Sequence, residues 1–133
     1  MTKELVLMFD DNIIKIDRWK IALTPDVDFH SFKSFEEFEQ CQGKKALLER
    51  ASLVLMDEEF GDCLASDRGY AEELRSSYGY KGIIALCSVK EGFGMSDEDL
   101  NQFDIVLKAK PKPWSIVRKR LLLDLPNKRK NCL

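Results

Sequence analysis

The sequence predicts an α/β fold in which a five-stranded parallel sheet is covered by helices on both faces. Short apolar runs without polar alternation recur along the chain, as is typical of strands buried on both faces. Segments of helical periodicity separate these runs, and successive strand-helix-strand crossovers build a doubly wound, three-layer sandwich. The 133 residues are enough for one domain with its own core.

The apolar runs give the positions of the strands. We expect strands near residues 4–9, 26–31, 52–57, 82–87 and 104–108. In the second run, polar residues are interleaved with Val27, Phe29 and Phe32. This mixed character is explained by a position at an edge of the sheet.

The first two expected helices have clear start signals. Asp11 or Asn12 caps the first helix, whose buried face includes Trp19 and Leu23. Ser34 caps the second with the Ser-x-x-Glu spacing of a capping box. We expect one continuous second helix, with a buried stripe formed by Phe35, Phe38, Leu47 and Leu48.

Three further helices are expected. The third covers residues 69–75, and a short fourth opens at residues 96–99. The fifth helix has an apolar face of Trp114, Val117, Leu121 and Leu122, and Pro126 ends it.

The chain divides into a domain at residues 1–124 and a basic tail at residues 125–133 that we expect to be mobile. The net charge is −2, yet residues 108–133 contain nine Lys or Arg and one acid, Asp124. A solvated helix surface explains this asymmetry most simply. A basic surface that meets an acidic partner is the alternative.

Composition excludes several classes of protein. No apolar stretch is long enough to span a membrane and the charged first residues do not form a signal peptide, so we expect a cytoplasmic protein that does not bind membranes. The four cysteines lack CxxC spacing and His30 is the only histidine, which argues against a zinc or thioredoxin-like site.

Reactive side chains follow four of the expected strands. They are Asp10 and Asp11, Asp57, Cys87 and Ser88, and Lys110 with Pro111. Because ligands bind at the carboxyl ends of strands in open parallel sheets, we expect these groups to converge. Three carboxylates brought together would repel one another unless a hard divalent cation bound them. The pattern therefore predicts a Mg²⁺-dependent site that accepts a phosphoryl group.

These motifs resemble the receiver domain of two-component response regulators over about residues 4–123. Phe9-Asp10-Asp11-Asn12 is similar to the family's acidic metal-binding pair, and Leu53-Val54-Leu55-Met56-Asp57 to its phospho-acceptor strand. Ile83-Ile84-Ala85-Leu86-Cys87-Ser88 is similar to its switch strand, and Lys110-Pro111 to its Lys-Pro after strand five. The resemblance implies a flavodoxin-like fold with strand order 2-1-3-4-5.

The resemblance also implies a role for each residue. Asp57 would accept a phosphoryl group from a histidine kinase or histidine phosphotransfer protein, and Lys110 would contact the phosphoryl oxygens. The metal contributors would be Asp10, Asp11, Asp57 and the backbone carbonyl of Glu59.

Such a protein is a regulatory phospho-acceptor that catalyses its own phosphorylation and dephosphorylation, rather than an enzyme acting on other substrates. It would signal to a downstream protein target through the surface from strand 4 to helix 5. A homodimer through the helix 4 to helix 5 face is also possible in this family. The basic tail is too short to predict direct nucleic-acid binding.

Among the departures from the family pattern, two concern the proposed site residues. Cys87 stands where the family carries Thr or Ser, so either Ser88 substitutes for it or the activated state is held less firmly, because a thiol is a weak donor. Lys108, Lys110 and Lys112 compete for the ammonium role, and we prefer Lys110 because a proline follows it directly. These departures keep an alternative open: a degenerate receiver that acts as a phosphorylation-independent protein-interaction module.

Overall fold

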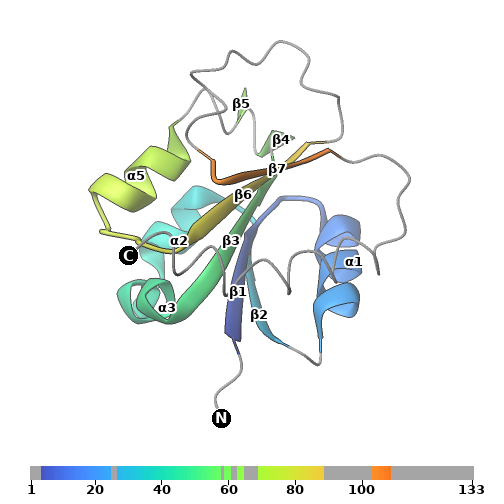
Figure 1. Ribbon diagram of the computed structural model, residues 1–133, viewed down its shortest axis with the longest axis horizontal. Helices are drawn as coiled ribbons and strands as arrows, with labels where there is room; N and C mark the ends of the chain where they lie inside the picture. The colour runs from blue at the N-terminus through green and yellow to red at the C-terminus, as the bar shows by residue number, and fades with distance from the viewer. Residues whose placement is uncertain are drawn as a thin grey trace.

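A five-stranded parallel sheet forms the centre of the computed structural model (Figure 1). The structure describes residues 4–24, 27–57, 59–60, 63–64, 69–88 and 103–108, with the backbone alone for 59–60, 63–64, 88 and 105–108. The strands of the sheet are β1 (Glu4–Phe9), β2 (Val27–Phe32), β3 (Ala51–Asp57), β6 (Ile83–Ser88) and β7 (Ile105–Lys108). They are ordered β2-β1-β3-β6-β7, which confirms the predicted order 2-1-3-4-5.

Burial along the strands follows their place in the sheet. Every residue of β3 is buried, and β1 is buried from Leu5 onward. β2 alternates between buried, half-buried and exposed residues, and it lies at an edge, as its mixed sequence predicts.

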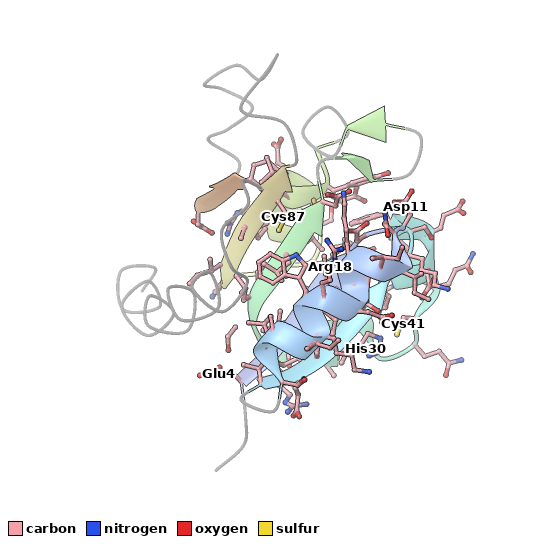
Figure 2. All side chains as sticks on the ribbon, turned by 90° about the vertical axis from the view of Figure 1, so that its right-hand side faces the viewer. Glu4, Asp11, Arg18, His30, Cys41 and Cys87 are labelled. Atoms are coloured by element: carbon pink, nitrogen blue, oxygen red, sulfur yellow. The ribbon has the colours of Figure 1, made fainter. Side chains whose placement is uncertain are left out.

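Helices cover both faces of the sheet (Figures 1 and 2). On one face, α1 (Ile13–Leu23) buries Ile16, Trp19 and Leu23 against the even-numbered residues of β1 and the odd-numbered residues of β3. The other face is covered by α2 (Phe35–Gln40), α3 (Lys44–Arg50) and α5 (Tyr70–Ser76). Together the layers form the three-layer sandwich that the sequence predicts.

Capping residues fix the helix starts. The side chain of Asn12 accepts hydrogen bonds from the backbone N–H groups of Ile14 and Lys15, so Asn12 is the cap of α1. The Ser34 hydroxyl accepts one from Glu37 N at 3.0 Å and caps α2. Gly69, at φ +66°, begins α5 in the left-handed region that glycine adopts without strain.

The expected single second helix is wrong. The structure has two shorter helices, because the chain leaves helical geometry at Cys41, which is extended, and resumes it after Gly43. Glycine is a poor helix former, and its low propensity favours a break at this point. The buried stripe is divided accordingly: Phe35 and Phe38 belong to α2, and Leu48 to α3.

A side-chain network fixes the start of β7. The Asp104 carboxylate accepts hydrogen bonds from Arg75 Nη2 of α5 at 2.6 Å and from the backbone N–H of Ile84 at 2.9 Å. Arg75 also donates to the carbonyl oxygen of Gly82. These bonds tie β6, β7 and α5 together at the end of the sheet away from the predicted site.

A small antiparallel pair follows β3: β4 (Glu59–Phe60) with β5 (Cys63–Leu64). The sequence did not predict it, because two-residue strands carry no periodic signal. The expected fourth and fifth helices and the domain boundary at residue 124 lie outside the described residues. Within the described ranges, no helix has the length and apolar character needed to cross a bilayer.

Candidate functional site

Asp10 is held at the end of β1 by its backbone and its neighbours. Its N–H donates to Phe32 O at 3.1 Å, which extends the β1–β2 ladder by one residue. The ring of Phe9, the last residue of β1, packs against the rings of Phe32 and Phe38 with centroids 5.4 Å apart in both cases. This aromatic packing fixes the strand end that carries Asp10.

The two oxygens of the Asp10 carboxylate have different environments. Oδ1 accepts a hydrogen bond from Asn12 N at 2.8 Å. Oδ2 is buried and has no hydrogen-bond partner among the described residues. A buried, unpartnered carboxylate oxygen is costly, so this atom is a natural place for a ligand.

Asp57 ends β3 and lies next to β6. Its side chain is 4% exposed, and it occupies the same register position as Cys87 of β6. The Lys15 ammonium of α1 donates to Asp57 Oδ1 at 3.4 Å. Asp57 is therefore a buried carboxylate with one cationic neighbour among the residues that the structure describes.

The fold brings the three predicted carboxylates together. One oxygen each from Asp10, Asp11 and Asp57 can be chosen so that all lie within 4.8 Å of one another. Asp10 and Asp57 are buried, whereas Asp11 is exposed to solvent. In Figure 2, Asp11 and Cys87 lie toward the end of the sheet opposite Glu4, where the chain enters β1.

The electrostatics of the cluster raise the pKa values of its two buried carboxyl groups in the metal-free protein. Burial, together with the adjacent Asp10 carboxylate, raises the pKa of Asp57 to about 7, and the Lys15 ammonium offsets only part of this effect. Burial also raises the pKa of Asp10, against the hydrogen bond from the backbone of Asn12. A divalent cation would reverse both shifts.

These observations fit a hard divalent cation. Mg²⁺ takes oxygen ligands and is bound by one or two carboxylates while it keeps several waters. The cluster offers only oxygen ligands at this point, one of its carboxylates is exposed, and Asp10 Oδ2 lacks any other partner among the described residues.

Cys87 is the described residue of the predicted switch pair. Its side chain is partly buried and packs against the core under α1. Burial, followed by the nearby carboxylates of Asp57 and Asp10, raises the pKa of the thiol above its usual range. At neutral pH the group is therefore a thiol rather than a thiolate.

The other predicted site residues are described only in part. The backbone of Ser88 pairs with that of Lys108 across β6 and β7, and Glu59 lies in β4 opposite Leu64. Lys110 and Lys112 lie outside the described residues. Which lysine serves the site stays a prediction.

Sequence reasoning missed Lys15. For a lysine in the first turn of an amphipathic helix, the local pattern predicts a solvated side chain. Nothing in that pattern links it to an aspartate 42 positions away. The usable signal was its distance from the acidic pair. Four positions after Asp11, a long side chain on α1 can reach back over the strand ends.

The fold is shared with several solved receiver domains. One is a response regulator receiver domain (CheY-like) from Methylobacillus flagellatus, 16% identical with a TM-score of 0.73, covering 93% of this chain and 99% of that one. Another is the signal receiver domain of a putative LuxO repressor protein from Vibrio parahaemolyticus, 13% identical with a TM-score of 0.72, covering 96% and 93%.

A third is the signal receiver domain of the putative response regulator NarL from Mycobacterium tuberculosis, 19% identical with a TM-score of 0.70, covering 95% of this chain and 98% of that one. Neither a protein-family model nor a curated protein matches this sequence. The chain has the fold of response regulator receiver domains, as the sequence motifs predict.

Proposed function

We propose that the chain is a phospho-acceptor receiver in two-component phosphorelay signalling, with Asp57 as the acceptor. The proposal rests on the position of Asp57 in the sheet and its distance from the other two carboxylates. In a receiver fold, the buried Asp57 carboxylate lies at the carboxyl end of the central strand β3, and its oxygen is within 4.8 Å of oxygens from Asp10 and Asp11. Ligands bind at this end of open parallel sheets.

Four groups would hold Mg²⁺ at this place: the carboxylates of Asp10, Asp11 and Asp57, and the backbone carbonyl of Glu59. When bound, the cation supplies positive charge that neutralises the carboxylates and the transferring phosphoryl oxygens. The Oδ2 atom of Asp10 supports this assignment, because it is a buried acceptor without a hydrogen-bond partner among the described residues.

The reaction needs an ionised Asp57. One of its oxygens attacks phosphorus, the bond from phosphorus to the donor's imidazole nitrogen breaks, and the products are a phosphoaspartate and the donor's free histidine. Positioning and charge neutralisation provide most of the rate in such transfers. Lys110 is our proposed ammonium contact for the phosphoryl oxygens, and Cys87 or Ser88 the proposed hydrogen-bond donor to them.

The phosphodonor is a histidine kinase or a histidine phosphotransfer protein, and the output is a change in the surface running from strand β6 through β7 to the segment after it. A downstream protein would bind this surface in only one phosphorylation state. Homodimerisation through the same region is a second way to use it.

Phosphorylation by a small donor tests the proposal. The protein is incubated with acetyl phosphate and Mg²⁺, and its intact mass is measured. We expect a gain of one phosphoryl group that does not occur when excess chelator is present from the start and is absent from Asp57→Asn. A protein that never gains mass, with Mg²⁺ present and the fold intact by circular dichroism, would contradict it.

One observation favours a second function, that of a phosphorylation-independent interaction module. The residue beside Asp57 on β6 is Cys87, whose neutral thiol is a weaker donor than a hydroxyl. Binding of Mg²⁺ with beryllofluoride separates the two functions. A phospho-acceptor binds this phosphoryl mimic saturably, whereas a degenerate receiver does not.

A further inference from the structure

The position of Lys15 is fixed by the turn that follows the acidic pair. Asn12 Oδ1 accepts hydrogen bonds from Ile14 N at 3.0 Å and from Lys15 N at 3.3 Å, which places Lys15 in the first turn of α1. Ile16 packs into the core one residue later. The capping bonds and the packing of Ile16 therefore hold the backbone of Lys15 in place next to the acidic pair.

The side chain of Lys15 turns toward the acidic cluster rather than into solvent. It is 28% exposed, and its Nζ lies 3.4 Å from Oδ1 of Asp57, which is 4% exposed. Lys20, on the same helix, is exposed. Among the described side chains, one ammonium is paired with the Asp57 carboxylate, and it comes from α1.

The ion pair and a bound cation would use the same carboxylate. The oxygens of Asp10, Asp11 and Asp57 that could bind a metal lie within 4.8 Å of one another, and Asp57 contributes to both this set and the ion pair. A divalent cation at Asp57 would stand beside a like charge in a poorly solvated place, where repulsion is strong.

We propose that Lys15 is a built-in counter-ion of Asp57 that competes with the divalent cation. In the metal-free protein the ammonium neutralises the buried carboxylate. When the cation binds, Lys15 leaves Asp57 and turns to solvent, which its long, partly exposed side chain allows. Lys15 is thus a positioning residue that sets how much cation the site needs. This inference rests on the metal site of the proposed function.

Calorimetric titration with Mg²⁺ tests the competition. The proteins are the wild type, Lys15→Met, which keeps an unbranched side chain, and Lys20→Met, which removes the same charge from the exposed side of α1. We expect Lys15→Met to bind Mg²⁺ about tenfold more tightly than the wild type, and Lys20→Met to stay within about twofold of it. Equal affinities for the two variants would overturn the proposal.

A double-mutant cycle supplies a second readout. Urea unfolding is measured for the wild type, Lys15→Met, Asp57→Asn and the double variant, in chelator and in saturating Mg²⁺. We expect a favourable coupling between the two residues in chelator that disappears in Mg²⁺. A coupling of the same size in both conditions would show that Lys15 stays on Asp57, against the proposal.

The two proposals fail in distinguishable ways. If neither the wild type nor the two lysine variants bind Mg²⁺, the metal site of the proposed function is wrong, and so is the proposed competition. If the wild type, Lys15→Met and Lys20→Met bind Mg²⁺ equally and all three gain a phosphoryl group from acetyl phosphate, the phospho-acceptor function stands and only the role of Lys15 is overturned. A slower phosphoryl transfer in Lys15→Met at saturating Mg²⁺ would also contradict competition, because it would assign Lys15 to the phosphoryl group itself.

Discussion

Asp57 and Cys87 occupy the same register position on the neighbouring parallel strands β3 and β6. The thiol therefore lies beside the carboxylate of Asp57, the proposed acceptor, and after burial that carboxylate is the next cause that raises the pKa of Cys87. A phosphoryl group on Asp57 would have this weak donor next to it. Cys87 stands where the family carries Thr or Ser, and the effect of this difference on the binding of a phosphoryl mimic can be measured.

Replacing Cys87 with Ser should strengthen binding of the phosphoryl mimic beryllofluoride in the presence of Mg²⁺. A hydroxyl donates a stronger hydrogen bond than a thiol, and a bond to a charged acceptor is worth about 1.5–3 kcal/mol, so we expect an affinity gain of about tenfold. Fluorescence or calorimetric titration measures it. Cys41→Ser, at the partly buried turn between α2 and α3, is the matched control. An unchanged affinity would assign the donor role to Ser88.

The Asp10→Asn variant should lose affinity for Mg²⁺ by about 10–100-fold. The amide keeps the oxygen that accepts from Asn12 N, but it replaces the unpartnered Oδ2 and removes the negative charge. Titration of the metal checks this, with Asp17→Asn on the exposed side of α1 as the charge-matched control. Equal losses in both variants would mean that general charge, rather than the cluster, attracts the cation.

The stability of the metal-free protein should fall as pH rises. The folded pKa of Asp57 is about 7 against an ordinary value of 3.8, so the folded state binds the proton more tightly than the unfolded state does. This stabilisation is complete below about pH 4 and is lost by about pH 7. Asp57→Asn has no such loss.

The stability advantage of Asp57→Asn over the wild type should therefore grow between pH 4 and pH 8, by about 4 kcal/mol if Asp57 acts alone. Urea unfolding in chelator measures this difference, and saturating Mg²⁺ should reduce it. A difference that does not change with pH would show that Asp57 is not destabilised by burial.

Asp104→Ala should lower the free energy of unfolding by about 1–3 kcal/mol, because Arg75 and the Ile84 N–H lose their acceptor. Asp28→Ala is the control, since it breaks the exposed ion pair with Arg50, and such pairs contribute less than about 1 kcal/mol. Chemical denaturation compares the two. Equal effects would argue that the Asp104 network contributes no more than a surface pair.

The sequence predicts best those features that depend on local patterns. The strands that lead to Asp10 and Asp57 contain continuous apolar runs, and Ser34 has the spacing of a cap, so periodicity and capping chemistry suffice for them. The break between α2 and α3 was missed because the apolar residues on either side of Gly43 were assigned to one helix.

The ion pair between Lys15 and Asp57 shows what such patterns cannot predict. It depends on how α1 packs across the sheet, which brings together residues with no local relationship. The acidic cluster was predictable for a different reason. Strand ends converge in every open parallel sheet, so the topology alone places Asp10 near Asp57.

Locating the phosphoryl group on the chain is the decisive test of Asp57 as the acceptor. The protein is phosphorylated with acetyl phosphate and Mg²⁺ and digested, and the modified peptide is identified by mass spectrometry, with Asp57→Asn treated in parallel. We expect one phosphoryl group, on the peptide that contains Asp57, and none on the variant. A phosphoryl group on another peptide, or an equal mass gain in Asp57→Asn, would contradict it.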